Sequence, residues 1–340
     1  MGMNKSVYCE FSFLKDFLRS CPKHGDDPFE ADPVASWMKV YQLLCTSRTF
    51  IDIPKNKFAQ EALANELLMR FFKRSQTSLH FCDKGFPFNN MNIALSDIDI
   101  LHSIYLTSKN KIERAELSKA IGIIVLGKQD INKFELLFKE KTFAIPKGDE
   151  VKSWKDVDFP EYVNVSNSMI VVDNYLLKSE DNTLSLLDIL LPTKLDNVFH
   201  LSIYTMPTPN QERSNCGDII KKIKKLRSTD LLAVKIVISK VSKAFFHDRT
   251  IITNNVWIDC GSGFDLFSDG RASKRTNIRF AFPFLMNAAN RKSWENEAYF
   301  YLVEDILKME KPGVSHTFEI DYWGEEIRNN RLLSYYSKRD

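Results

Sequence analysis

The residues best suited to chemistry lie in one short stretch of the second half of the chain. His247 is followed two positions later by Arg249, and Asn254 comes five positions after that, on an apolar run typical of a β-strand. A second apolar run leads into the sequence Gly261-Ser262-Gly263, which suits either a backbone anion site or a tight turn. An imidazole and a guanidinium together bind phosphate, and the imidazole is also able to act as nucleophile or general acid. The stretch therefore predicts a phosphate-handling site.

The string from His247 to Phe267 resembles the phospholipase-D-like superfamily, whose half-domains each carry a His-x-Lys-x4-Asp motif at the edge of an α/β sheet. It is similar in particular to the phospholipase-D-like domain at the C-terminus of microtubule-interacting-and-trafficking proteins and to its bacterial relatives, over about residues 165–270. The resemblance places His247, Arg249 and Asn254 at the motif positions and implies phosphodiester cleavage through a phosphohistidine, without a metal or cofactor. Catalytic members combine two motifs and this chain has one, so cleavage requires a homodimer that brings two copies of His247 to one phosphate.

The departures from the motif leave other functions open. Arg249 stands where the motif has lysine, and Asn254 stands where it has an aspartate that would hold an imidazolium. Three hypotheses for the function remain. The first is a protein that binds or cleaves nucleic acid, and the resemblance to the bacterial relatives implies a role in antiviral defence or as a toxic effector. The second is a non-enzymatic scaffold whose site is degenerate or is completed by a partner protein. The third is an adaptor that binds anionic lipid, as the trafficking branch implies. For His247 alone, a structural role at a strand end is a further alternative.

Other basic residues would extend a phosphate site along a nucleic-acid backbone if they shared one face. Some lie on a predicted helix over residues 218–227 and others follow the glycine turn: Lys221, Lys222, Lys224, Lys225, Arg271, Lys274 and Arg275. The helical lysines are interleaved with apolar residues at core spacing, so a solvated helix face explains them equally well. The net charge of 47 − 44 = +3 does not decide between the two explanations.

The elements that must position these residues follow a regular order. We predict strands over 169–173, 200–204 and 231–239, helices over 181–191 and 218–227, and two further strands at His247 and Val256. This β-α-β-α-β-β-β order predicts an α/β sheet with helices on its faces. The corresponding domain spans residues 165–340 and ends in a helical extension.

The first half, residues 1–150, is predicted to be a separate α/β domain with an open sheet. We expect a strand over 7–13, helices from 32 and over 58–72, and a parallel strand–helix–strand unit over 103–126. The polar residues 148–160 are predicted to be a linker.

Carboxylates in the first half are scattered as in metal-dependent nucleases such as PIN-like domains. They are Glu10, Glu66, Asp97 and Asp99. The resemblance implies magnesium, whereas helix capping explains the same residues without a metal. We favour capping and predict no metal site.

Composition is that of an ordinary globular protein, with 44% hydrophobic and 27% charged residues among 340. The six cysteines form no Cys-x-x-Cys pair, which argues against a zinc site and a disulfide framework. The first residues lack the apolar stretch of a signal peptide, and no apolar run reaches the length of a membrane span. We therefore expect a soluble, cytoplasmic protein without a transmembrane segment.

Overall fold

The computed structural model describes residues 6–20, 32–86, 103–206, 215–239, 249–282, 302, 305–306, 320–324, 330 and 332–333. The chain divides into two compact units, Met1–Lys139 and Glu140–Asp340. Helices and strands alternate in both, so the predicted α/β class is confirmed. Among the described residues, no helix combines the length and the apolar composition needed to span a bilayer.

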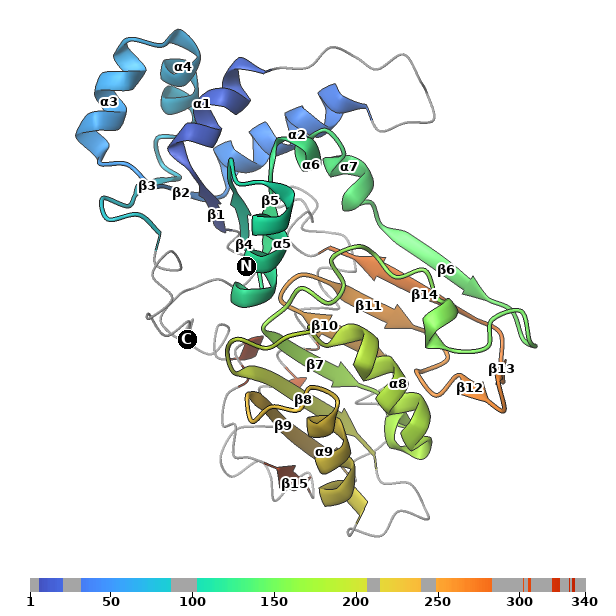
Figure 1. The fold of residues 1–340 in the computed structure, drawn as a ribbon. Coiled ribbons are helices and arrows are strands. Elements are labelled where there is room, and N and C mark those ends of the chain that lie inside the picture. Colours follow the sequence, from blue (N-terminus) through green and yellow to red (C-terminus); the bar gives the residue numbers. More distant parts are fainter. Residues whose placement is uncertain are drawn as a thin grey trace. The chain divides into compact units, whose positions relative to one another are not determined.

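The first unit contains a parallel sheet whose described strands have the order β3-β2-β1-β4-β5 (Figure 1). The strands are β1 Ser6–Cys9, β2 Arg48–Ile51, β3 Leu79–Phe81, β4 Ser103–Leu106 and β5 Ile124–Leu126. The helices are α1 Phe11–Arg19, α2 Pro33–Thr46, α3 Lys55–Leu63, α4 Glu66–Ser75, α5 Lys111–Ile121, α6 Lys128–Ile131 and α7 Phe134–Leu137. The parallel pairing of β4 with β5 around α5 confirms the predicted strand–helix–strand unit.

Two elements of the first unit differ from their predictions. The strand predicted over 7–13 ends at Cys9, because its last residues belong to α1. The helix predicted over 58–72 is interrupted at Asn65, whose side-chain oxygen accepts the backbone N–H groups of Leu67 (3.1 Å) and Leu68 (3.2 Å). This capping starts a new helix, α4, so the segment forms two helices and not one continuous helix.

The second unit contains a mixed sheet whose described strands have the order β15-β9-β8-β7-β10-β11-β14-β6. The strands are β6 Lys141–Ile145, β7 Ser168–Val172, β8 Phe199–Thr205, β9 Leu232–Ser239, β10 Thr250–Thr253, β11 Trp257–Cys260, β14 Thr276–Ala281 and β15 Ile320–Gly324. The short strands β12 Phe267–Ser268 and β13 Arg271–Ala272 form a separate pair. The helices are α8 Glu180–Leu190 and α9 Asn215–Lys225, preceded by the 3-10 turns η3 Trp154–Asp156 and η4 Leu176–Lys178.

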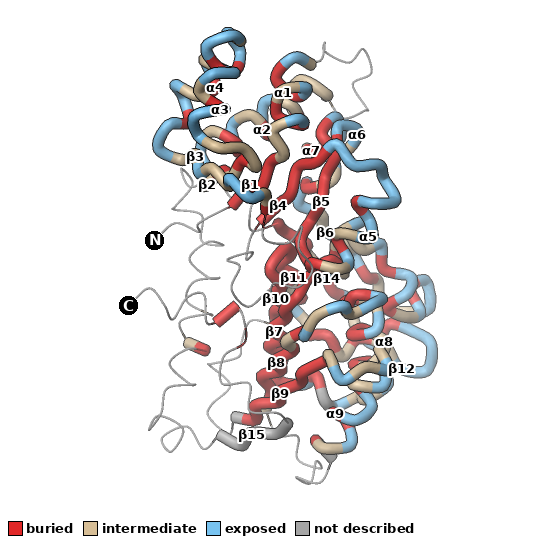
Figure 2. The backbone as a smooth tube through the Cα atoms, turned by 60° about the vertical axis from the view of Figure 1, so that its left-hand side comes forward, coloured by how far each residue is buried: buried red, intermediate tan, exposed pale blue. Residues whose placement is uncertain are grey.

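The predicted β-α-β-α-β-β-β order is present from β7 to β11. β7, β8 and β9 are parallel, and α8 and α9 connect them on the same face of the sheet (Figures 1 and 2). The central strands are almost fully buried (Figure 2). Of the predicted C-terminal helical segment, residues 302, 305 and 306 are described and are helical; most of the extension lies outside the described residues.

The second unit begins earlier than predicted. β6 pairs with β14 from Lys141↔Phe280 to Ile145↔Thr276, so it belongs to the second sheet although it precedes residue 150. The stretch predicted to be a linker contains Trp154, whose side chain is only 1% exposed. This segment is therefore part of the second unit's core.

Candidate phosphate site

Polar residues gather at one edge of the second sheet. The parallel strands β7 and β8 end there, and the antiparallel β10 begins there, because Val172 pairs with both Tyr204 and Thr250. β11 ends at the same edge, since the Cys260 N–H donates to the Arg249 carbonyl (3.0 Å). Ligands of open α/β sheets commonly bind at the carboxyl ends of the parallel strands. We call this site the carboxyl rim and define it as Asp173, Asn174, Tyr175, Thr205, Arg249, Gly261–Gly263 and Lys274.

Arg249 is the central cation of the carboxyl rim. Its Nη1 donates to the Gly261 carbonyl at 2.7 Å, and its Cζ lies 5.7 Å from the ring centroid of Tyr175. These two contacts fix the guanidinium between the glycine turn and an aromatic ring. Its Nε is buried and has no hydrogen-bond partner among the described residues. A planar guanidinium held in this way retains donors for an anion.

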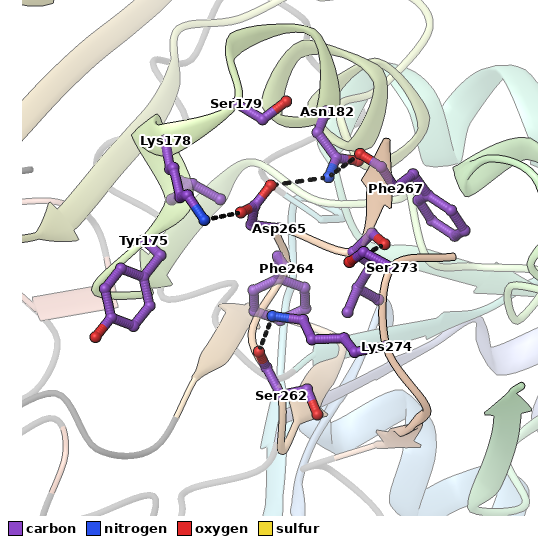
Figure 3. Close-up of polar contacts among 12 residues, drawn as sticks. Tyr175, Lys178, Ser179, Asn182, Ser262, Phe264, Asp265, Phe267, Ser273 and Lys274 are labelled. Carbon is purple, nitrogen blue, oxygen red and sulfur yellow. Dashed lines mark hydrogen bonds and ion pairs between the residues drawn. The ribbon is translucent and has the colours of Figure 1, made fainter. Parts of the chain in front are cut away.

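Lys274 brings a second positive charge to the same place. Its Nζ donates to the Ser262 carbonyl at 2.6 Å, as Figure 3 shows. The turn that carries Ser262 continues to Asp265, which lies 3.7 Å from the ammonium group of Lys178 (Figure 3). Lys274 and Lys178 therefore flank one turn, and the charge of Lys178 is offset by its carboxylate partner.

Asp173 joins two backbone segments of the carboxyl rim by hydrogen bonds. Its side chain is fully buried and accepts the backbone N–H groups of Tyr175 (2.8 Å) and Phe264 (2.6 Å). Burial raises the pKa of Asp173, although these two N–H donors and the charges of Arg249 and Lys274 act in the opposite direction. Two cations and one carboxylate leave an excess of one positive charge, which an anionic ligand would neutralise.

Two further polar atoms of the carboxyl rim are buried without a hydrogen-bond partner in the described part of the chain. They are Oδ1 of Asn174 and Oγ1 of Thr205. Buried polar groups in native proteins are nearly always paired, so each needs a water or a ligand atom. Thr205 lies on the strand next to Asp173, one position beyond the pair Val172↔Tyr204. The unmet hydrogen bonds therefore occur at the same edge as the cations.

The structure separates Asn254 from Arg249, which corrects the predicted juxtaposition. Arg249 precedes β10 and Asn254 follows it, so they lie at opposite ends of the strand. Asn254 is fully buried, and its Oδ1 accepts the backbone N–H of Asn167 at 3.0 Å. Its side chain joins the loop before β7 to the loop after β10 and does not reach the carboxyl rim. His247 lies outside the described residues.

We expect Asn254→Ala to reduce stability and to leave ligand affinity unchanged. The substitution strips the buried Asn167 N–H of its acceptor, which costs about 1–3 kcal/mol of unfolding free energy. Thermal and denaturant unfolding measure the loss, and nucleic-acid affinity is measured where the variant is folded. Asn277→Ala, at an exposed position on β14, is the matched control and should change stability by less than about 0.5 kcal/mol. A loss of affinity without a loss of stability would contradict this assignment.

The predicted basic residues divide between α9 and the segment that follows the glycine turn. On α9, Lys221 is paired with Asp218 at 3.0 Å, and Lys222 is paired with Glu180. That helix packs on β9, α8 and β15, and its lysines face solvent except for the half-buried Lys224. Beyond the glycine turn, Lys274 belongs to the carboxyl rim, and its sequence neighbours Arg271 and Arg275 are exposed.

The two described carboxylates of this predicted set, Glu10 and Glu66, are paired with neighbouring side chains. Glu10 accepts hydrogen bonds from the hydroxyl groups of Tyr105 (2.6 Å) and Thr107 (2.7 Å) and from the Ser108 N–H (2.9 Å). Glu66 forms a surface ion pair with Arg70 one helical turn away. Asp97 and Asp99 lie outside the described residues. In the described part of the chain, no three His, Cys, Asp or Glu side chains are grouped to hold a metal ion.

Comparison with known proteins found no protein-family model that matches the chain and no matching curated protein. The sequence motif alone would not have identified Asp173, Asn174 or Thr205 as parts of a site. The available signal was positional, because each residue ends or follows a buried parallel strand. That such residues lie at the same edge of the sheet can be predicted only when the strand order is known.

Proposed function

We propose that the carboxyl rim binds the phosphodiester backbone of nucleic acid. The observation that carries this proposal is Arg249, which is fixed by Gly261 and Tyr175 while its buried Nε remains without a partner among the described residues. A guanidinium with unused donors matches the paired oxygens of a phosphate. Lys274 supplies the second cation, and the exposed Tyr175 supplies an aromatic surface on which a base stacks.

The same arrangement accounts for the buried polar atoms of the carboxyl rim. Phosphate oxygens only accept hydrogen bonds, so the Thr205 hydroxyl is a suitable donor to them. The Asn174 oxygen accepts, and it suits a ribose hydroxyl or a base amino group on the same ligand. His247, two positions before Arg249 in the sequence, is the candidate nucleophile if the bound phosphodiester is also cleaved.

Nucleic-acid binding is tested with labelled single- and double-stranded DNA and RNA. Arg249→Ala is expected to weaken binding about tenfold to a hundredfold, since a hydrogen bond to a charged group contributes about 1.5–3 kcal/mol. Lys274→Ala should reduce the slope of log affinity against log salt by about 1, as the loss of one phosphate contact predicts. Lys194→Ala is the matched control, because Lys194 lies in the loop before β8, at the opposite edge of the sheet, and pairs with Asp196.

The results separate binding, cleavage and the absence of a site. Equal retention of nucleic acid by the wild type, Arg249→Ala and Lys194→Ala would refute the proposal. Cleavage in the presence of a chelator that is lost in His247→Ala would add a metal-independent phosphodiesterase activity. Binding without cleavage in either protein would assign the carboxyl rim to recognition alone.

A further inference from the structure

A pocket of about 470 Å³ lies in the first unit, within the size range of small-molecule sites. It is bounded by α1 and α2, by the loop that follows β4 and the start of α5, and by α6, which follows β5. The order of strands in the first sheet reverses between β1 and β4. The chain adds β2 and β3 on one side of β1, and then β4 and β5 on its other side. The pocket is thus placed at the carboxyl ends of the strands where the strand order reverses, the usual ligand position in an open α/β sheet.

One wall of this pocket is aromatic and held in place. Phe17 and Trp37 are stacked with centroids 4.9 Å apart and an interplanar angle of 16°. Phe13 extends the stack, with its centroid 6.1 Å from that of Phe17. The Trp37 indole N–H donates to the Phe17 carbonyl at 3.1 Å, which fixes the indole ring. The pocket therefore offers a preformed aromatic surface to a planar apolar group.

Part of the pocket lining is cationic. Lys109, Lys111 and Lys128 are exposed, and no hydrogen bond or ion pair joins their ammonium groups to another described residue. Arg114 is different, because it pairs with Asp130 at 2.8 Å and donates to the Lys109 carbonyl at 2.7 Å. It therefore holds the loop, and its charge is offset.

The remaining lining residues complete the chemistry of the pocket. Asp16 is the one acidic side chain among them, so three lysines and one carboxylate give 3 − 1 = +2. Gln129 and Asn132 add amide groups, which are able to donate and accept hydrogen bonds. The lining thus combines an aromatic wall, amides and an excess of positive charge.

We propose that this pocket binds a nucleoside monophosphate unit, with the base against the aromatic wall and the phosphate at the lysines. In this proposal the amides of Gln129 and Asn132, which also line the pocket, hydrogen-bond to the polar edge of the base. The ligand is either a free mononucleotide or the phosphorylated 5′ end of a strand, which share this chemistry. The inference is independent of the carboxyl rim, because the two sites lie in different units and have no residue in common.

The test is calorimetric titration of the full chain with AMP, GMP, CMP and UMP. Adenosine and inorganic phosphate serve as partial ligands, and an RNA tetranucleotide with or without a 5′ phosphate distinguishes the two sources. At least one monophosphate should bind at least about tenfold more tightly than adenosine or phosphate, because each partial ligand uses half of the pocket. The double variant Lys109→Glu/Lys111→Glu should weaken that binding by at least about tenfold, since it reverses two charges beside the phosphate.

Two variants control for net charge and for the other site. Lys119→Glu reverses one charge at an exposed position near the far end of α5, and it should leave nucleotide affinity unchanged. Arg249→Ala should also leave it unchanged. No binding of any monophosphate at millimolar concentration would overturn the inference, as would an equal loss in Lys119→Glu. Loss of mononucleotide binding in Arg249→Ala would place the ligand at the carboxyl rim, refuting this inference while supporting the proposed function.

Discussion

Replacing Trp154 by alanine is expected to lower the free energy of unfolding of the second unit by about 3–5 kcal/mol. The indole is 1% exposed, and its Nε1 donates to Oδ1 of Asn182 at 2.8 Å. Its ring also meets Phe267 edge-on at 5.2 Å and lies 6.1 Å from Phe264. Alanine would leave a cavity and an unpaired amide oxygen in the layer that supports the carboxyl rim.

Hydrogen exchange followed by mass spectrometry is the appropriate measurement, because it reports on each unit separately. Loss of protection should appear in β7, α8 and β11 and should be absent from β1, β4 and α5. Lys155→Ala, at the exposed neighbouring position, is the control and should change protection little. A Trp154→Ala protein as protected as the wild type would show that residues 148–160 act as a linker after all.

We expect Gly263→Ala to lower the free energy of unfolding by about 2–4 kcal/mol, the second large effect. Gly263 has φ = +85°, a conformation that alanine adopts only with strain. An added Cβ would lie 2.8 Å from Cδ of Arg249 and 3.0 Å from Oδ2 of Asp173. The methyl group would therefore displace the guanidinium and disturb the hydrogen bond that the Phe264 N–H donates to Asp173. Affinity for nucleic acid should fall together with stability.

Two other glycines of the same region separate strain from crowding. Gly270 has φ = +68° with no atom within 4 Å of an added Cβ, so alanine there should cost about 1–2 kcal/mol from strain alone. Gly261 also has open space and no positive φ, so alanine should cost nothing measurable. Denaturant unfolding should rank the losses as Gly263 > Gly270 > Gly261. Equal losses at Gly263 and Gly270 would show that the contact with Arg249 does not constrain the turn.

Local sequence patterns predicted the elements whose periodicity is unmistakable. The buried runs that became β7, β8 and β9 and the helices between them were predicted within a few residues. The start of α1 was missed because Val7, Cys9, Phe11 and Phe13 alternate like a strand over a short window. The helical period becomes visible only when the following buried residues are included, Leu14, Phe17 and Leu18.

Long-range pairing was not predictable from the same patterns. Nothing near β6 indicates that it pairs with β14, since the paired residues are more than 130 positions apart in the chain. The composition of the site was equally unpredictable from local sequence patterns. The spacing of Arg249 and Asn254 fits one strand, but whether both ends of that strand meet one ligand depends on the neighbouring strands. A motif specifies positions along the chain, and only the strand order decides which of them face each other.

The positions of β6, β15 and Asn330 have a consequence for synthesis on the ribosome. The described first sheet is complete once residue 126 has emerged, because all of its strands precede that point. The second sheet needs β15, and Asn330 then donates to the Met169 carbonyl on β7 and to the Ser202 hydroxyl on β8. The second sheet therefore cannot be completed until residue 330 has emerged, and the strands made earlier stay without these contacts until then.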